Sequence, residues 1–177
     1  MTELDSRCLE AFPTWLRTLG EDARALAALV ENESAPAAVR KSSAAALNYL
    51  FKSLDLIPDG IEDLGFIDDA FVFRVAASRA GAGDAADPVV SRLAADTGLI
   101  RDFLGDDFSR LEAYVAGLGG TASRGRTVDD ILADASVLAV FVREVRTWAD
   151  GYKEPAFQRD AKNLVKLKSF LCAKLPK

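Results

Sequence analysis

The stretch FIDDAFVFRVAASRA, residues 66–80, is apolar on most of the circumference that it would have as an α-helix. A helix at the surface of a globular protein keeps one face polar, so a helix that is apolar nearly all round has to be surrounded by other helices. Gly81 and Gly83 follow the stretch and end it. The sequence therefore predicts a central helix over residues 66–80 and an all-α fold packed around it.

The rest of the chain repeats the helical pattern. Apolar residues recur at 3.6-residue spacing, and no segment shows the alternation of a strand. Caps and helix breakers, with Gly20 between the first two segments and Pro58 after the third, divide the chain into expected helices over 4–19, 23–30, 35–57, 66–80, 88–98, 99–118, 128–148 and 155–175. We expect a single compact bundle of about seven or eight helices, with residues 1–177 forming one domain.

Composition excludes several classes of protein. The 177 residues are 50% hydrophobic and carry a formal charge of -5, whereas a nucleic-acid-binding protein needs a basic footprint. The chain has no histidine, which removes the usual general base, the commonest zinc ligand and every Ser-His or Cys-His triad. Cys8 and Cys172 lack metal-like spacing and are expected as free thiols in a reducing compartment. With no secretory signal at the N-terminus, we expect a cytoplasmic protein that does not bind nucleic acid.

Residues 47–75 read LNYLFKSLDLIPDGIEDLGFIDDAFVFRV and contain the most distinctive string of the chain. Its fixed points are Asp55-Leu56-Ile57-Pro58-Asp59, then Gly65, then Asp68-Asp69 before the apolar helix. This segment resembles the YkvA-like family, a bacterial domain of unknown function. The resemblance implies a helix-turn-helix hairpin over 39–80 with a shared acidic turn, and it carries no activity over to this chain.

Three positions depart from the family pattern: Ser53 and Glu62 replace prolines, and Gly60 stands where an apolar or aromatic residue is common. These changes loosen the expected turn. The candidate functional residues that the resemblance marks are Asp55, Pro58, Asp59, Gly65, Asp68 and Asp69.

Turn and cap chemistry explains each residue of the motif. Pro58-Asp59-Gly60 is a turn signal, and Asp63 is expected to cap the next helix. Asp68 and Asp69 in the first turn of that helix favour the positive end of its dipole. This interpretation does not explain the concentration of negative charge, since residues 55–69 contain six acids and no base. Carboxylates about 6 Å apart repel by about 3 kcal/mol at an effective dielectric of 20.

Three kinds of group can offset this repulsion. The first is the protein's own bases, with Lys41, Lys52, Arg74 and Arg79 as candidates, and the second is a basic partner surface. The third is a Mg²⁺ or Ca²⁺ ion, for which the candidate ligands are Asp59, Asp63, Asp68 and Asp69. An EF-hand is excluded because Phe66 stands where the loop needs its final bidentate acid. We favour the protein's own bases and expect no resident cofactor.

Two further segments carry charge or flexibility. Residues 117–126 form a glycine-rich loop with two arginines, but they match neither a P-loop nor a dinucleotide fingerprint, so we interpret them as a linker. Residues 153–177 contain seven bases and two acids, on a predicted amphipathic helix. Such a helix docks on the core with solvated lysines, or it contacts anionic lipid.

These observations favour a noncatalytic helical interaction module with an unidentified protein partner. The turn from Asp55 to Asp69 is its distinctive surface, and the C-terminal helix either covers this turn or contacts a partner. The alternatives are a carboxylate-based hydrolase that depends on a divalent cation and a peripheral membrane protein that uses the basic C-terminal helix. The sequence leaves the substrate, the partner and the oligomeric state open.

Overall fold

The computed structural model covers residues 1–177 and describes all of them except Leu54, Asp59, Glu62 and residues 82–86. Within the described chain there are eight α-helices and two short 3-10 turns, with one isolated bridge from Ser123 to Arg126 and no strand. The prediction of an all-α fold is confirmed. The helices are α1 Glu3–Glu31, α2 Ala37–Tyr49, α3 Ile67–Arg79, α4 Pro88–Leu104, α5 Phe108–Gly117, α6 Val128–Ala133, α7 Ala135–Gly151 and α8 Ala161–Lys174.

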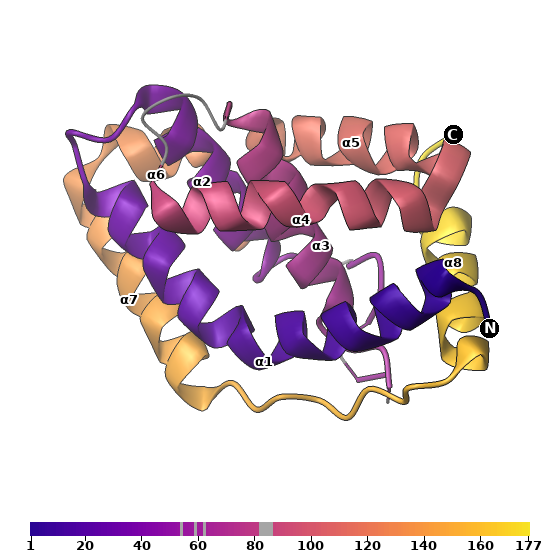
Figure 1. Ribbon diagram of the computed structural model, residues 1–177. Coiled ribbons are helices and arrows are strands. Elements are labelled where there is room, and N and C mark those ends of the chain that lie inside the picture. Colours follow the sequence, from indigo (N-terminus) through magenta and orange to yellow (C-terminus); the bar gives the residue numbers. More distant parts are fainter. Residues whose placement is uncertain (54, 59, 62, 82–86) are drawn as a thin grey trace.

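Helix α3 is the central helix that the sequence predicts. Every residue from Ile67 to Ala77 is buried, and α3 contacts α1, α2, α4 and α5. Figure 1 shows α3 passing through the middle of the bundle. Three phenylalanines join α1, α3 and α4, since the ring of Phe12 lies edge-on to Phe71 at 5.1 Å and to Phe103 at 5.2 Å. Such aromatic contacts add to the free energy gained by burying the rings.

The first helix differs from the prediction. The sequence suggested two helices separated by Gly20, whereas α1 runs without a break from Glu3 to Glu31. Gly20 is buried inside α1, and a Cβ added there would lie 3.4 Å from a ring carbon of Tyr152. Because Gly20 has no side chain, Tyr152 in the segment after α7 can pack close to α1. The glycine does not end a helix.

Helix α2 ends earlier than predicted, at Tyr49 and not at the residue before Pro58. The next amides turn back, with Phe51 N donating to Asn48 O and Lys52 N donating to Tyr49 O, both at 3.1 Å. The chain leaves the helix because Leu56 and Ile57 enter the core, where their exposed fractions are 3% and 0%.

Two predicted boundaries further along are also displaced. Helix α4 starts at the predicted Asp87–Pro88 cap but continues through Gly98 and ends at Gly105, which has a φ of 60°. The helix predicted over 128–148 is two helices, because Asp134 interrupts it and accepts hydrogen bonds from the first amides of α7. The predicted capping box of Thr127 and Asp130 at the start of α6 is confirmed.

The C-terminal segment begins with an extended strap over residues 152–159, and α8 starts only at Ala161, not near Pro155 as predicted. The strap is fixed on α1, since the Tyr152 hydroxyl donates to Leu16 O at 2.7 Å and Phe157 packs on Phe12. Figure 1 shows the strap along one edge of the bundle and α8 at the end where both termini lie. Among the helices described, none is both long and apolar enough to span a membrane.

Candidate functional site

The carboxylate of Asp68 is the hydrogen-bonding centre of the acidic turn. Asp68 is 0% exposed, and its Oδ2 accepts from the Tyr49 hydroxyl at 2.6 Å and from Ile57 N at 3.2 Å. The Tyr49 hydroxyl in turn accepts from Leu56 N at 2.8 Å. The end of α2, the start of the turn and the first turn of α3 are therefore joined through one buried carboxylate.

The Tyr49 hydroxyl stays protonated in this setting. Burial raises the pKa of Tyr49 far above its usual value, and the charges of Asp68 and Asp69 raise it further. A tyrosine that keeps its proton donates to a carboxylate, which is the geometry observed. The same causes raise the pKa of Tyr114 to about 12, burial first and the charge of Asp68 second. Neither phenol can act as a base near neutral pH.

The other predicted residues of the motif lie in different environments. Asp69 and Gly65 are buried, Asp55 is half-buried and Pro58 is exposed. Pro58 forms the predicted turn, since its carbonyl accepts from Ile61 N at 3.0 Å. Asp59, which was predicted both as a motif residue and as a metal ligand, lies outside the described residues.

The prediction that Asp63 caps the next helix is wrong. Phe66 is the N-cap residue of α3 and makes no side-chain cap bond. Asp63 has a φ of 73°, and its carbonyl accepts from the side chain of Asn163 at 3.3 Å. This bond comes from α8, which cannot be foreseen from a local cap pattern.

Metal binding gains no support from the described acids. No three acidic or thiol side chains in the described part of the chain are placed to hold one ion, and this includes Asp63, Asp68 and Asp69. The Oδ2 of Asp68 already accepts hydrogen bonds from Tyr49 and Ile57. Cation binding through a set that includes Asp59 stays a prediction.

Contacts are described for two of the bases considered as an offset for the turn, Lys52 and Arg74. The Lys52 ammonium lies 5.1 Å from the ring centre of Tyr114. Arg74 donates through Nε to Asp96 of α4 at 3.0 Å and through Nη1 to Ala70 O at 3.1 Å.

Arg74 forms a buried ionic cluster that the sequence did not predict. Its guanidinium is 0% exposed and stacks on Trp15, with 4.1 Å from Cζ to the ring centre. Burial lowers the pKa of Arg74 to about 10, while Asp96 and Asp22 act in the opposite direction. The group therefore remains charged at neutral pH. One base within the apolar stretch 70–77 was the signal for this cluster, and it did not identify the partners.

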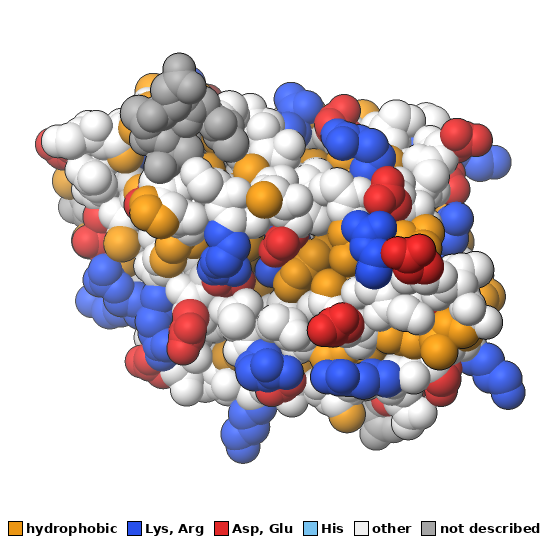
Figure 2. Space-filling view, in the orientation of Figure 1, with side chains coloured by type: hydrophobic (Ala, Val, Ile, Leu, Met, Phe, Trp, Pro, Cys, Tyr) orange, Lys and Arg blue, Asp and Glu red, His pale blue; other side chains and the backbone are white. Residues whose placement is uncertain are grey.

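The cluster continues to the surface between α1 and α4. Asp22 is buried, pairs with Arg92 on α4 and lies 4.0 Å from Arg74. Its second oxygen accepts from the Thr18 hydroxyl at 3.1 Å. These residues line an open groove of about 600 Å³. Figure 2 shows acidic and basic side chains on both sides of the strip between the two helices. In this groove Asp22 pairs with Arg92, and Asp96 pairs with Arg74.

A family model described as a protein of unknown function (DUF1232) matches residues 40–74. The chain is similar to that family over this segment. Neither the search of curated proteins nor the search of solved structures finds a match. The match supports a domain of unknown function over residues 40–74.

The matched segment coincides with the buried contacts described above. At its start, Arg40 donates through Nε and Nη2 to Val30 O, at 3.0 and 2.9 Å, near the end of α1. Its middle contains the Tyr49–Asp68 pair, and its last residue is Arg74. The segment therefore supplies contacts that connect α2 and α3 to α1 and α4.

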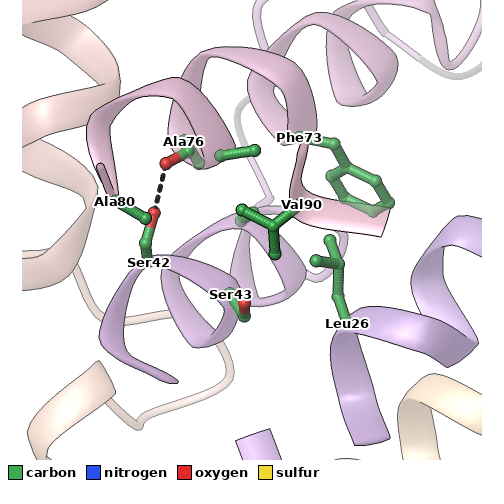
Figure 3. A pocket seen from close by; sticks show the side chains of 9 residues that line it. Leu26, Ser42, Ser43, Phe73, Ala76, Ala80 and Val90 are labelled. Carbon is green, nitrogen blue, oxygen red and sulfur yellow. Dashed lines mark hydrogen bonds between the residues drawn. The ribbon is translucent and has the colours of Figure 1, made fainter. Parts of the chain in front are cut away.

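A second cavity is too small for a substrate. It has a volume of about 10 Å³ and lies between α1, α2, α3 and α4. Figure 3 shows the Ser42 hydroxyl bonded to the carbonyl of Ala76 at its edge, with Leu26, Phe73 and Val90 around it. A cavity of this size is at the lower limit for one water molecule.

Proposed function

We propose that this chain is a noncatalytic helical interaction module, in which the acidic motif stabilises the fold and the outer side of the turn after α2 contacts a partner protein. The observation that carries the proposal is the burial of Asp68 and its bonds to Tyr49 and Ile57. The motif's central acid is used to hold the turn in place, so the turn offers a fixed surface and not a reactive group.

The string from Asp55 to Asp59 supports the finer assignment of this segment to YkvA-like proteins, and it agrees with the matched range. We place the protein inside the cell. Its two cysteines support this location, because Cys8 and Cys172 are both free thiols.

The hydrolase alternative has less support. A carboxylate-based hydrolase needs acids that reach both a metal ion and a substrate. Asp68 and Asp69 have exposed fractions of 0% and 2%, so an external phosphate ester cannot reach them without opening the turn.

Site-specific photocrosslinking tests the interaction proposal. A photoreactive amino acid is placed at exposed Gly60 in the turn and, as a matched control, at exposed Glu33 in the loop between α1 and α2. In cells of the source organism, we expect one crosslinked product of discrete mass from position 60 and none of that mass from position 33. Equal products from both positions contradict the proposal.

A separate experiment tests the proposal that the protein is noncatalytic. The purified protein is incubated with a chromogenic phosphate ester and Mg²⁺, and we expect no turnover above buffer. Turnover that Asp69→Asn abolishes, in a variant with unchanged helical circular dichroism and melting temperature, would favour the hydrolase.

A further inference from the structure

We propose that the segment from Lys153 to Lys177 is a docking surface for anionic lipid headgroups at a bilayer surface. This inference goes beyond the interaction module proposed above, since it rests on the bases of the C-terminal segment and not on the acids of the turn, which α8 contacts through the bond from Asn163 to Asp63 O.

Most of the basic charge of this segment has no ion-pair partner among the described acids, although the charge of Lys168 contributes to lowering the pKa of Asp107. All seven bases are exposed, and none of them forms an ion pair with a described acid; they are Lys153, Arg159, Lys162, Lys166, Lys168, Lys174 and Lys177. The two acids of the segment have other roles. Glu154 lies 4.0 Å from Arg17 of α1, and Asp160 caps α8 by accepting from Asn163 N at 2.8 Å. The segment therefore presents a net positive charge to solvent.

Helix α8 presents two of these bases on its outer face. Its inner face, with Leu164, Leu167 and Leu171, is buried against the bundle. Lys162, Val165 and Lys166 are exposed on the other side. Val165 is 67% exposed and is one of three exposed large hydrophobic residues in the described chain. Figure 1 shows α8 at one end of the bundle. The helix can meet a surface while its leucines stay in the core.

Arg110 holds the C-terminal end of α8 in this position. Its Nη2 donates to Cys172 O at 2.9 Å and also to Leu175 O, and its Nε donates to Pro176 O at 3.1 Å. The carbonyls at the end of a helix have no partners within the helix, so these bonds satisfy them. Docking on a surface therefore requires no release of α8 from the protein.

The type of base favours lipid over a specific anionic ligand. Six of the seven bases are lysines, which act as compact point charges on long flexible stems, whereas bidentate recognition of a single phosphate favours arginine. The negative surface potential of an anionic bilayer attracts each nearby base by about 1 kcal/mol, or about fivefold in affinity. Because Val165 alone buries little apolar area, the attraction is mainly electrostatic, and salt screens it.

The orientation follows from the charge distribution. The whole chain carries -5 and this segment carries +5, so the remaining residues carry -10. An anionic surface repels that remainder and attracts the C-terminal end. The docked protein therefore faces the bilayer with the outer side of α8 and the adjoining end of the strap, where Arg159 is exposed.

Vesicle flotation with the full chain tests this surface. The probes are vesicles of phosphatidylcholine alone and of phosphatidylcholine mixed with phosphatidylglycerol, each at low and high salt. We expect the protein to float only with the mixed vesicles at low salt. Lys162→Gln combined with Lys166→Gln should lower the partition coefficient by about 25-fold, from about fivefold for each base.

The matched control is Lys41→Gln combined with Arg79→Gln, which removes two exposed bases on α2 and α3 and changes the net charge equally. It should keep the binding of the unmodified protein. An equal loss in both double variants, or no flotation with any vesicle, overturns the proposal. Binding to polyglutamate without flotation also overturns it and assigns the surface to an acidic protein partner.

Discussion

A single buried carboxylate shows how the acidic turn is used at the scale of residues. Burying a charge is unfavourable unless hydrogen bonds replace its hydration. Asp68 receives such bonds from the Tyr49 hydroxyl and from Ile57 N, and Tyr49 also accepts from Leu56 N. Removal of the tyrosine hydroxyl therefore takes a donor from the carboxylate and an acceptor from a buried amide.

We predict that Tyr49→Phe lowers the free energy of unfolding by about 2–4 kcal/mol, because buried polar groups without partners each cost about 1–3 kcal/mol. Urea denaturation measures the change. Tyr152→Phe is the control, since its half-buried hydroxyl makes one bond to Leu16 O, and it should cost about 0.5–1.5 kcal/mol. Equal costs for the two variants would contradict the special role of Tyr49.

Whether the acids of the turn bind a divalent cation can also be tested at individual residues. If the acids of the turn are structural, millimolar Mg²⁺ or Ca²⁺ leaves the melting temperature unchanged. An ion bound only to the folded state would instead stabilise it by about 2.7 kcal/mol at a hundredfold excess over its Kd. Differential scanning fluorimetry with and without EDTA distinguishes these outcomes. A shift that disappears in Asp59→Asn or Asp63→Asn would establish a cation site.

At the scale of helices, the glycines differ in what they do. Gly98 lies inside α4 with no atom within 4 Å of an added Cβ, whereas Gly105 ends that helix with a φ of 60°. In sequence alone the two glycines look alike, and the first was predicted to end the helix. The backbone conformation, which depends on how α4 and α5 pack, separates them.

We predict opposite effects for alanine at these two positions. Gly98→Ala should raise the free energy of unfolding by about 0.8–1 kcal/mol, because alanine favours the helix interior over glycine. Gly105→Ala should lower it by about 1–3 kcal/mol, because the φ of 60° and ψ of -127° at this position are strained for a residue with a Cβ. Thermal and urea denaturation of both variants provide the measurement. Destabilisation by Gly98→Ala would mean that α4 ends at the predicted position.

At the scale of the whole molecule, the C-terminal segment completes the core. Leu167 and Leu171 are 0% exposed, and Phe157 of the strap packs on Phe12. We expect residues 1–177 to unfold as one cooperative unit, so deletion of 155–177 should destabilise the whole molecule and not only its end. Burial of a leucine contributes about 1.5–3 kcal/mol, while the total stability of a domain is about 5–15 kcal/mol.

Two substitutions on α8 test this view without deleting the helix. Leu167→Ala should lower the free energy of unfolding by about 2–5 kcal/mol, since it opens a cavity in the core. Val165→Ala is the matched control on the exposed side, and it should change stability by less than about 0.5 kcal/mol. Small effects of both substitutions would show that α8 is not docked.

Local sequence was sufficient to predict most of the helices. The apolar circumference of residues 66–80 identified the central helix, and the caps at Asp87 and Thr127 are in place. Boundaries were predicted less well at Gly20, Tyr49, Gly98 and Asp134, because each depends on a contact or a backbone angle set by packing. For the candidate site, the sequence marked Asp68 as a motif residue and Arg74 as one of four bases that could offset the turn, but it did not reveal the partners of either residue.

What the sequence determined by itself is the class of fold, through helical periodicity, and the absence of histidine chemistry, through composition. Only the tertiary structure decided what the charged residues do. It buried Asp68 against Tyr49, paired Arg74 with Asp96 and left the bases of α8 in solvent. The physical reason is that periodicity and caps act within a few residues of chain, whereas the state of a buried charge depends on partners brought together from distant helices.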